Sequence, residues 1–119
     1  AALKMVPLIG QACAIGDQKP FVAALVTLDP EVAPVWAKNN GVAFDSLADL
    51  ATKAEVIDEI DRGVKEVMEQ FNNAERVKKV TVLGEEWLPD SEELTPTMKL
   101  KRRGIYTKYA DVIERLYQR

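Results

Sequence analysis

The chain has 119 residues, of which 47% are apolar, and its formal net charge is −3. This length fits one compact domain. Because the positive and negative charges nearly balance, the overall electrostatic field does not attract the chain to nucleic acid or to an anionic membrane. The sequence contains no apolar stretch near the roughly 20 residues that span a bilayer. Histidine is absent, which excludes histidine-based general bases, nucleophile pairs and metal sites.

Two apolar runs near the start predict a β-hairpin. They cover residues 8–15 and 21–28, and residues 16–20 between them are turn formers. The second run is apolar on both of its alternating faces, which predicts a central strand with material packed on each side. The single cysteine, Cys13, lies in the first run and cannot close a disulfide within the chain. We expect it in the core of a cytoplasmic protein.

Three helices are predicted after the hairpin. The pair Asp29-Pro30 supplies an N-cap and a first helical residue, and the helix ends near residues 39–41. The pair Asp45-Ser46 caps a brief turn through residues 47–50. A capping box of Thr52 and Glu55 should open the longest helix. Its apolar stripe consists of Val56, Ile57, Ile60, Val64, Val67, Met68 and Phe71.

A third strand and a last helix complete the pattern. Residues 77–83 read as a strand, and a terminal amphipathic helix begins at Arg102. The order β-β-α-α-α-β-α predicts an α+β fold in which helices cover a small three-stranded sheet, a hairpin plus a third strand. The apolar positions of the last helix are Ile105, Tyr109, Val112, Ile113 and Leu116.

Residues 84–93 hold five carboxylates and no cation. Their spacing is not that of a calcium loop, so we expect a solvated edge and no metal site. Trp36 and Trp87 are expected at the edge of the core, since this is commoner for an aromatic ring than a role as a stacking platform.

The segment 94–103 is the one that could carry chemistry. Proline and two threonines predict an extended or turned first half, and the basic second half leads into the last helix. Lys99 therefore projects from a loop that is anchored at both ends. A lysine is suited to holding carboxylate and phosphate oxygens while negative charge develops. Most exposed lysines are simply solvated, so spacing alone does not assign this role.

At this point the sequence resembles the adenylate-forming ligase superfamily, and within it the long-chain acyl-CoA synthetases. The segment 94–103 is similar to the long-chain branch's form of the last motif of the superfamily, usually a glycine-lysine followed by two arginines. The departure is Met98 where other branches carry glycine, which directs the resemblance to the long-chain enzymes. The resemblance rests on Pro7-Leu8-Ile9, Gln11-Ala12, Gly16-Asp17, Pro20 to Val26, Leu94 to Arg103 and Lys108-Tyr109, and it covers nearly the whole chain.

The resemblance implies that residues 1–119 form the C-terminal lid domain of an AMP-forming long-chain fatty-acid:CoA ligase. Lys99 falls on the catalytic lysine, and Arg102 and Arg103 fall on the arginine pair, to which we assign no catalytic role. Such a lid closes for formation of acyl-AMP and then rotates so that CoA reaches the acyl-adenylate. Closure of this kind excludes water and completes the site.

The resemblance also implies what lies elsewhere. A large N-terminal domain that binds ATP, magnesium and the fatty acid is expected upstream of Ala1, together with the hinge and much of the CoA channel. The chain by itself is therefore expected to be inactive. Its partners would be its own N-terminal domain, ATP, a long-chain fatty acid and CoA. The full enzyme would be cytoplasmic or peripheral at the membrane.

Two alternatives stay open. The lid could belong to a fatty-acyl-AMP ligase that stops at the adenylate or uses another acceptor. It could instead be a non-enzymatic binding module, because Lys99 to Arg103 place four cations in five residues. The negative net charge, and the lack of aromatic residues among these cations, disfavour RNA as the partner of such a module.

Overall fold

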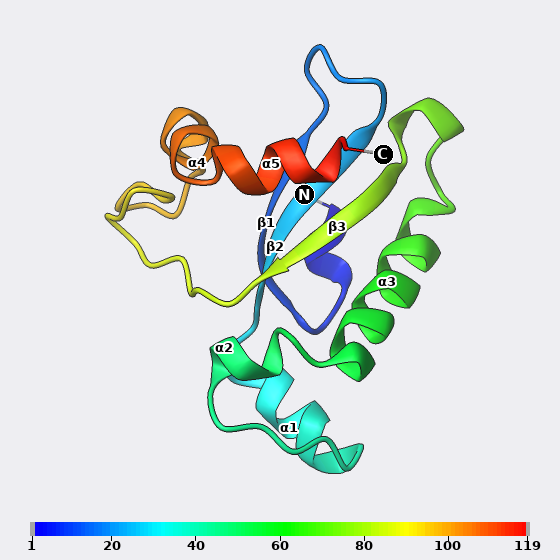
Figure 1. Cartoon of the computed structure of the whole chain (residues 1–119), viewed down its shortest axis with the longest axis vertical. Coiled ribbons are helices and arrows are strands. Elements are labelled where there is room, and N and C mark those ends of the chain that lie inside the picture. The colour runs from blue at the N-terminus through cyan, green and yellow to red at the C-terminus, as the bar shows by residue number, and fades with distance from the viewer. Residues whose placement is uncertain (1, 119) are drawn as a thin grey trace. The chain divides into compact units, whose positions relative to one another are not determined.

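A computed structural model describes residues 2–118 (Figure 1). The chain falls into two compact units, Ala1–Glu86 and Trp87–Arg119. The first unit contains the β-sheet and the longest helix, and the second contains the segment with Lys99. Within the described residues, none of the helices is long and apolar enough to cross a membrane.

The sheet of the first unit has three strands in the order β1-β2-β3. Strand β1 (Ile9–Ile15) pairs antiparallel with β2 (Val22–Leu28), so the predicted hairpin is confirmed. Strand β3 (Val77–Leu83) pairs parallel with the other edge of β2, which is therefore the central strand, as predicted. Cys13 is fully buried in β1. The predicted α+β class with a hairpin and a third strand is confirmed.

One face of the sheet packs against helices α1 (Val32–Asn39), α2 (Leu47–Leu50) and α3 (Ala54–Met68). Figure 1 shows the three strands side by side, with α3 running along the sheet. Two short 3-10 helices, η1 (Ala2–Met5) and η2 (Asn73–Glu75), flank this arrangement in the chain. The core takes Ala24, Val26 and Leu28 from β2, Ala33 and Ala37 from α1, Leu50 from α2, and Val56, Ile60, Val64 and Met68 from α3.

Of the three predicted helix starts, the one at Ser46 is confirmed, and the one at Asp29-Pro30 is right for the capping carboxylate but wrong for Pro30, which lies before the helix. The Asp29 carboxylate accepts hydrogen bonds from the backbone N–H groups of Glu31 and Val32, both at 2.9 Å, although the regular helix begins only at Val32. The Ser46 hydroxyl accepts from the Asp49 N–H at 3.0 Å. The predicted capping box at Thr52 is wrong.

The Thr52 hydroxyl donates back to the Asp49 carbonyl at 2.6 Å, and α3 starts after Lys53 without a side-chain cap. Only three residues separate α2 from α3. Thr52 therefore belongs to the end of the preceding helix, where its hydroxyl adds a second hydrogen bond to a carbonyl that already accepts from the Thr52 N–H at 3.0 Å.

The second unit contains two short helices, α4 (Arg102–Lys108) and α5 (Ala110–Leu116). The single terminal helix that the periodicity predicts is thus divided at Tyr109, whose φ is −107° and ψ is 24°. Figure 1 shows α4 and α5 running in different directions. The i to i−4 hydrogen bonds of Tyr109 and Ile113 persist across the bend, so the apolar spacing survives although the axis turns.

Candidate functional site

Lys99 lies on a short hairpin, residues 93–101, which we call the lysine hairpin. Leu94 and Leu100 form an antiparallel bridge, and the Thr95 N–H donates to the Lys99 carbonyl at 2.8 Å. Below them, the Lys101 N–H donates to the Glu93 carbonyl at 2.8 Å. The Thr95 hydroxyl also accepts from the Lys99 N–H at 3.0 Å. The backbone on both sides of Lys99 is thus fixed, while its side chain is exposed.

The tip of the lysine hairpin is a three-residue loop. The Met98 N–H closes a turn onto the Thr95 carbonyl at 2.9 Å, and Met98 then adopts a left-handed φ of 67°. This pattern matches a hairpin loop that ends in a bulge, in which the left-handed position ordinarily holds glycine. A side chain in this conformation costs roughly 1–2 kcal/mol. The glycine that the resemblance places before the lysine in other branches would therefore have a backbone reason, and Met98 departs from it.

The base of the lysine hairpin is tied to α4 by a buried polar cluster. Glu93 is only 4% exposed, and its carboxylate forms an ion pair with the Lys108 ammonium at 2.7 Å. The Tyr109 hydroxyl donates to the same carboxylate at 3.4 Å and accepts from the Trp87 indole N–H at 3.1 Å. Buried polar groups that are fully paired in this way hold one geometry, because breaking a pair leaves a desolvated group without its partner.

Gly104 lets the hairpin and α4 approach closely. A Cβ at this position would lie 2.3 Å from the backbone oxygen of Glu92, far inside van der Waals contact. Since the obstructing atom is backbone, it cannot rotate away. Glycine at this position thus sets how closely the start of α4 lies against the chain entering the lysine hairpin.

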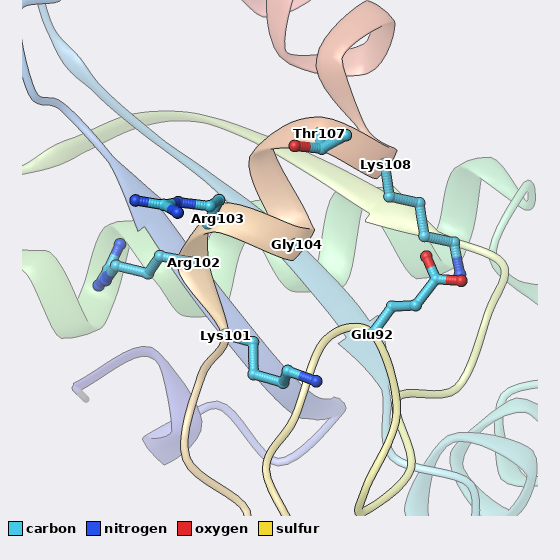
Figure 2. Close-up of a pocket in the computed structure, with 7 residues that line it drawn as sticks. All are labelled: Glu92, Lys101, Arg102, Arg103, Gly104, Thr107 and Lys108. Atoms are coloured by element: carbon cyan, nitrogen blue, oxygen red, sulfur yellow. The ribbon is translucent and has the colours of Figure 1, made fainter.

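Beside the hairpin is an open pocket of about 610 Å³ that carries four cations and one carboxylate. Figure 2 shows Arg102 and Arg103 extending to the same side from the start of α4, whereas Lys101 points the other way. Such an arrangement suits an anionic group. The lining residues are Glu92, Lys101, Arg102, Arg103, Gly104, Thr107 and Lys108.

The structure separates the residues that the sequence grouped together. Lys99 lies on the exposed tip of the lysine hairpin and does not line this pocket, whereas Arg102 and Arg103 do. The prediction that residues 84–93 are a solvated edge is wrong for Glu93, which is buried where it contacts Lys108 at the end of α4 and Tyr109 directly after it. Trp87, expected at a core edge, is 3% exposed. The sequence contains only a weak signal for the buried cluster around Glu93, namely the adjacent residues Lys108 and Tyr109 within the predicted last helix.

A second pocket, of about 350 Å³, lies in the first unit between α1 and α3 and includes Trp36, Glu59 and Arg62. The Arg62 guanidinium forms ion pairs with Glu59 and Glu66, each at 2.8 Å. The hydrogen bonds from Arg62 hold the pKa of Glu59 below its usual value. Two carboxylates of α3 already pair with Arg62, the cation of this pocket. We therefore expect this pocket to bind an anion less well than the pocket beside the lysine hairpin. Residues 2–118 contain no cluster of three or more His, Cys, Asp or Glu side chains suited to a metal ion.

The sequence is similar to those of long-chain-fatty-acid–CoA ligases. The sequence is 42% identical over 118 residues to the long-chain-fatty-acid–CoA ligase FadD15 of Mycobacterium tuberculosis, an alignment that covers 98% of this chain and 20% of that protein. It is 33% identical over 135 residues to the long-chain-fatty-acid–CoA ligase ACSBG1 of Mus musculus, covering 98% of this chain and 19% of that protein. The chain thus spans about a fifth of the length of the curated relatives it matches.

The fold is shared with a solved structure. The adenylation domain of a carboxylate reductase from Mycobacterium chelonae superposes with a TM-score of 0.72 at 21% identity, over 98% of this chain and 17% of that one. The family model described as the AMP-binding enzyme C-terminal domain matches residues 1–119. The sheet, the lysine hairpin and the match over the full sequence lead to one conclusion: this chain belongs to the family of AMP-binding enzyme C-terminal domains.

Proposed function

We propose that residues 1–119 form the C-terminal lid of an AMP-forming long-chain fatty-acid:CoA ligase and that Lys99 is its catalytic lysine. Family membership and the names of the relatives support the class of enzyme. The observation that carries the role of Lys99 is its place: an exposed side chain on a hairpin whose backbone is hydrogen-bonded on both sides. Such a lysine can be delivered to a site outside this chain without losing its orientation.

In the first half-reaction, a carboxylate oxygen of the fatty acid attacks the α-phosphorus of ATP. The bond to the bridging oxygen breaks, and acyl-AMP and pyrophosphate result. The Lys99 ammonium donates hydrogen bonds to the carboxylate and to the α-phosphate oxygens. It opposes the negative charge that gathers between them, and it does so in a site from which the closed lid has excluded water.

In the second half-reaction, the lid rotates away so that the thiol of CoA attacks the acyl carbonyl and AMP leaves. Lys99 has no role in that step. ATP, its magnesium, CoA and the fatty acid are assigned mainly to the rest of the ligase. Arg102 and Arg103 line the anionic-ligand pocket beside the hairpin, where they serve a phosphate or the large domain.

The test is Lys99→Ala in the complete ligase, with formation of acyl-AMP followed by pyrophosphate release. Adenylation should fall by at least about a hundredfold, the usual effect of removing one donor from such a site. Formation of acyl-CoA from supplied acyl-AMP should be largely retained. Lys65→Ala is the matched control, because Lys65 is an exposed lysine on α3 in the other unit. Intact adenylation in the Lys99 variant would refute the proposal.

The alternative functions give different results in the same assays. A fatty-acyl-AMP ligase would form acyl-AMP in a Lys99-dependent way but would not release AMP when CoA is added. A non-enzymatic binding module that uses the basic segment from Lys99 to Arg103 would form no acyl-AMP, and it would bind an acidic partner with an affinity that falls steeply with salt.

A further inference from the structure

Met98 occupies a backbone position at which glycine is the favoured residue. Its φ of 67° lies in the left-handed region, and the hydrogen bonds of the lysine hairpin hold it there. A glycine would adopt this conformation without a steric penalty. The chain instead carries a four-atom side chain at the residue directly before the proposed catalytic lysine.

The folded chain gains little from that side chain. Met98 is 44% exposed and is one of the few large apolar residues that remain at the surface. Its neighbours Thr97 and Lys99 are exposed as well. A strained residue whose side chain is not part of a core points to a role in function, since folding alone would favour glycine.

We propose that Met98 is a substrate-contact residue: when Lys99 holds the carboxylate of the reacting acid, the Met98 side chain packs on the methylene groups next to that carboxylate. This inference rests on the proposed function of Lys99. Adjacent Cα atoms are about 3.8 Å apart, and the carboxyl carbon is bonded directly to the alkyl chain. The Met98 side chain is exposed on the same hairpin tip as Lys99, so it is available to contact those methylenes when Lys99 binds the carboxylate. The flexible thioether of methionine adapts well to an alkyl surface.

The test compares Met98→Gln with Met98→Leu in the complete ligase. Both replacements are close to methionine in size and both carry a Cβ, so each keeps the steric penalty of the left-handed backbone. They differ in polarity. We expect Met98→Gln to raise the KM for the fatty acid about tenfold, because each apolar methylene contact is worth roughly a factor of four. The KM for ATP should not change. Met98→Leu, the conservative replacement, should retain at least half of kcat/KM.

Met98→Gly separates the side chain from the backbone, because it relieves the strained φ while removing the contact. It should lose as much kcat/KM for the fatty acid as Met98→Gln does. Equal effects of Gln and Leu, or full activity with Gly, would overturn the inference.

Lys99→Ala in the same assay distinguishes failure of the proposed role of Lys99 from failure of the proposed contact by Met98. If that variant still forms acyl-AMP, the proposed function fails. If it does not, and the Met98 variants behave alike, only the contact by Met98 is refuted.

Discussion

The Tyr109 hydroxyl links Trp87 to Glu93, and its removal should weaken the base of the lysine hairpin. In Tyr109→Phe the indole N–H loses the acceptor that it has at 3.1 Å, and the carboxylate loses a donor at 3.4 Å. Both partners are buried, so neither is readily satisfied by water. We expect a loss of about 1–2 kcal/mol in the free energy of unfolding, measured by urea denaturation of the chain.

Tyr106→Phe is the matched control for that measurement, because it deletes the same hydroxyl from a nearby tyrosine, on α4. Tyr106 is 36% exposed, and its hydroxyl accepts a long hydrogen bond of 3.4 Å from Arg102. Its removal should change the free energy of unfolding by less than about 0.5 kcal/mol. Equal effects of the two substitutions would mean that the buried cluster does not stabilise the hairpin.

At the residue scale, the candidate site was only partly predictable. The motif around Lys99 identifies the lysine through a family resemblance, and proline with two threonines predicts a turned, exposed segment. The sequence does not reveal that Glu93 is buried, since five carboxylates in ten residues look like a solvated edge. Its burial depends on Lys108 and Tyr109, fifteen and sixteen positions later. The left-handed φ of Met98 could not be predicted from the sequence either, because methionine rarely adopts this conformation.

Among the elements, α4 depends on Gly104 for its place against the lysine hairpin. Gly104→Ala would gain roughly 1 kcal/mol of helix propensity, but the new methyl would meet the Glu92 carbonyl at 2.3 Å. The clash should win, because overpacking against fixed atoms typically costs 1–3 kcal/mol. We expect a net destabilisation of up to about 2 kcal/mol and, in the complete ligase, a fall in adenylation of up to about a hundredfold through misplacement of Lys99.

Thr107→Ala serves as the control for Gly104→Ala, because it places the same residue on an exposed position of the same helix. That variant should be as stable as the parent or slightly more so. If Gly104→Ala also proved neutral in thermal unfolding and in pyrophosphate release, the close approach would not be what positions the hairpin.

The start of α2 allows a second test among the elements. Ser46→Ala removes the hydroxyl that accepts from the Asp49 N–H, and this should cost about 1 kcal/mol. Glu55→Ala should change stability by only a few tenths of a kcal/mol, because α3 has no side-chain cap that Glu55 could complete. Chemical denaturation distinguishes this result from a capping box of Thr52 and Glu55, in which loss of the glutamate side chain would cost about as much as loss of the Ser46 cap.

The elements themselves were largely predictable, because apolar alternation and the 3.6-residue period are local signals. Strands at residues 9–15, 22–28 and 77–83 and the long helix α3 appear where those signals place them. Local signals do not determine which strands pair or in which direction. The parallel pairing of β3 with β2 and the bend at Tyr109 therefore had to come from the structure.

On the scale of the whole molecule, charge is divided unevenly along the sequence. The unit Trp87–Arg119 contains seven Lys and Arg residues against five Asp and Glu, whereas the rest contains nine against fourteen. A net charge near −3 conceals this division. The unit that carries Lys99 is therefore the one with an excess of positive charge, which agrees with its proposed contact with a carboxylate and nucleotide phosphates.

The purified 119-residue chain is expected to show no turnover with ATP, magnesium, a long-chain fatty acid and CoA. Lys99 stabilises charge only if the acid and the nucleotide are already aligned beside it, and alignment of this kind accounts for roughly 7–11 kcal/mol of a barrier. Lys99 is exposed and is not among the residues that line the open pocket beside the hairpin. Release of AMP and pyrophosphate should therefore equal that of a protein-free blank, with the complete ligase as the positive control. Formation of acyl-CoA by the chain alone would show that the substrates bind here, and the assignment of this chain as a lid would then be wrong.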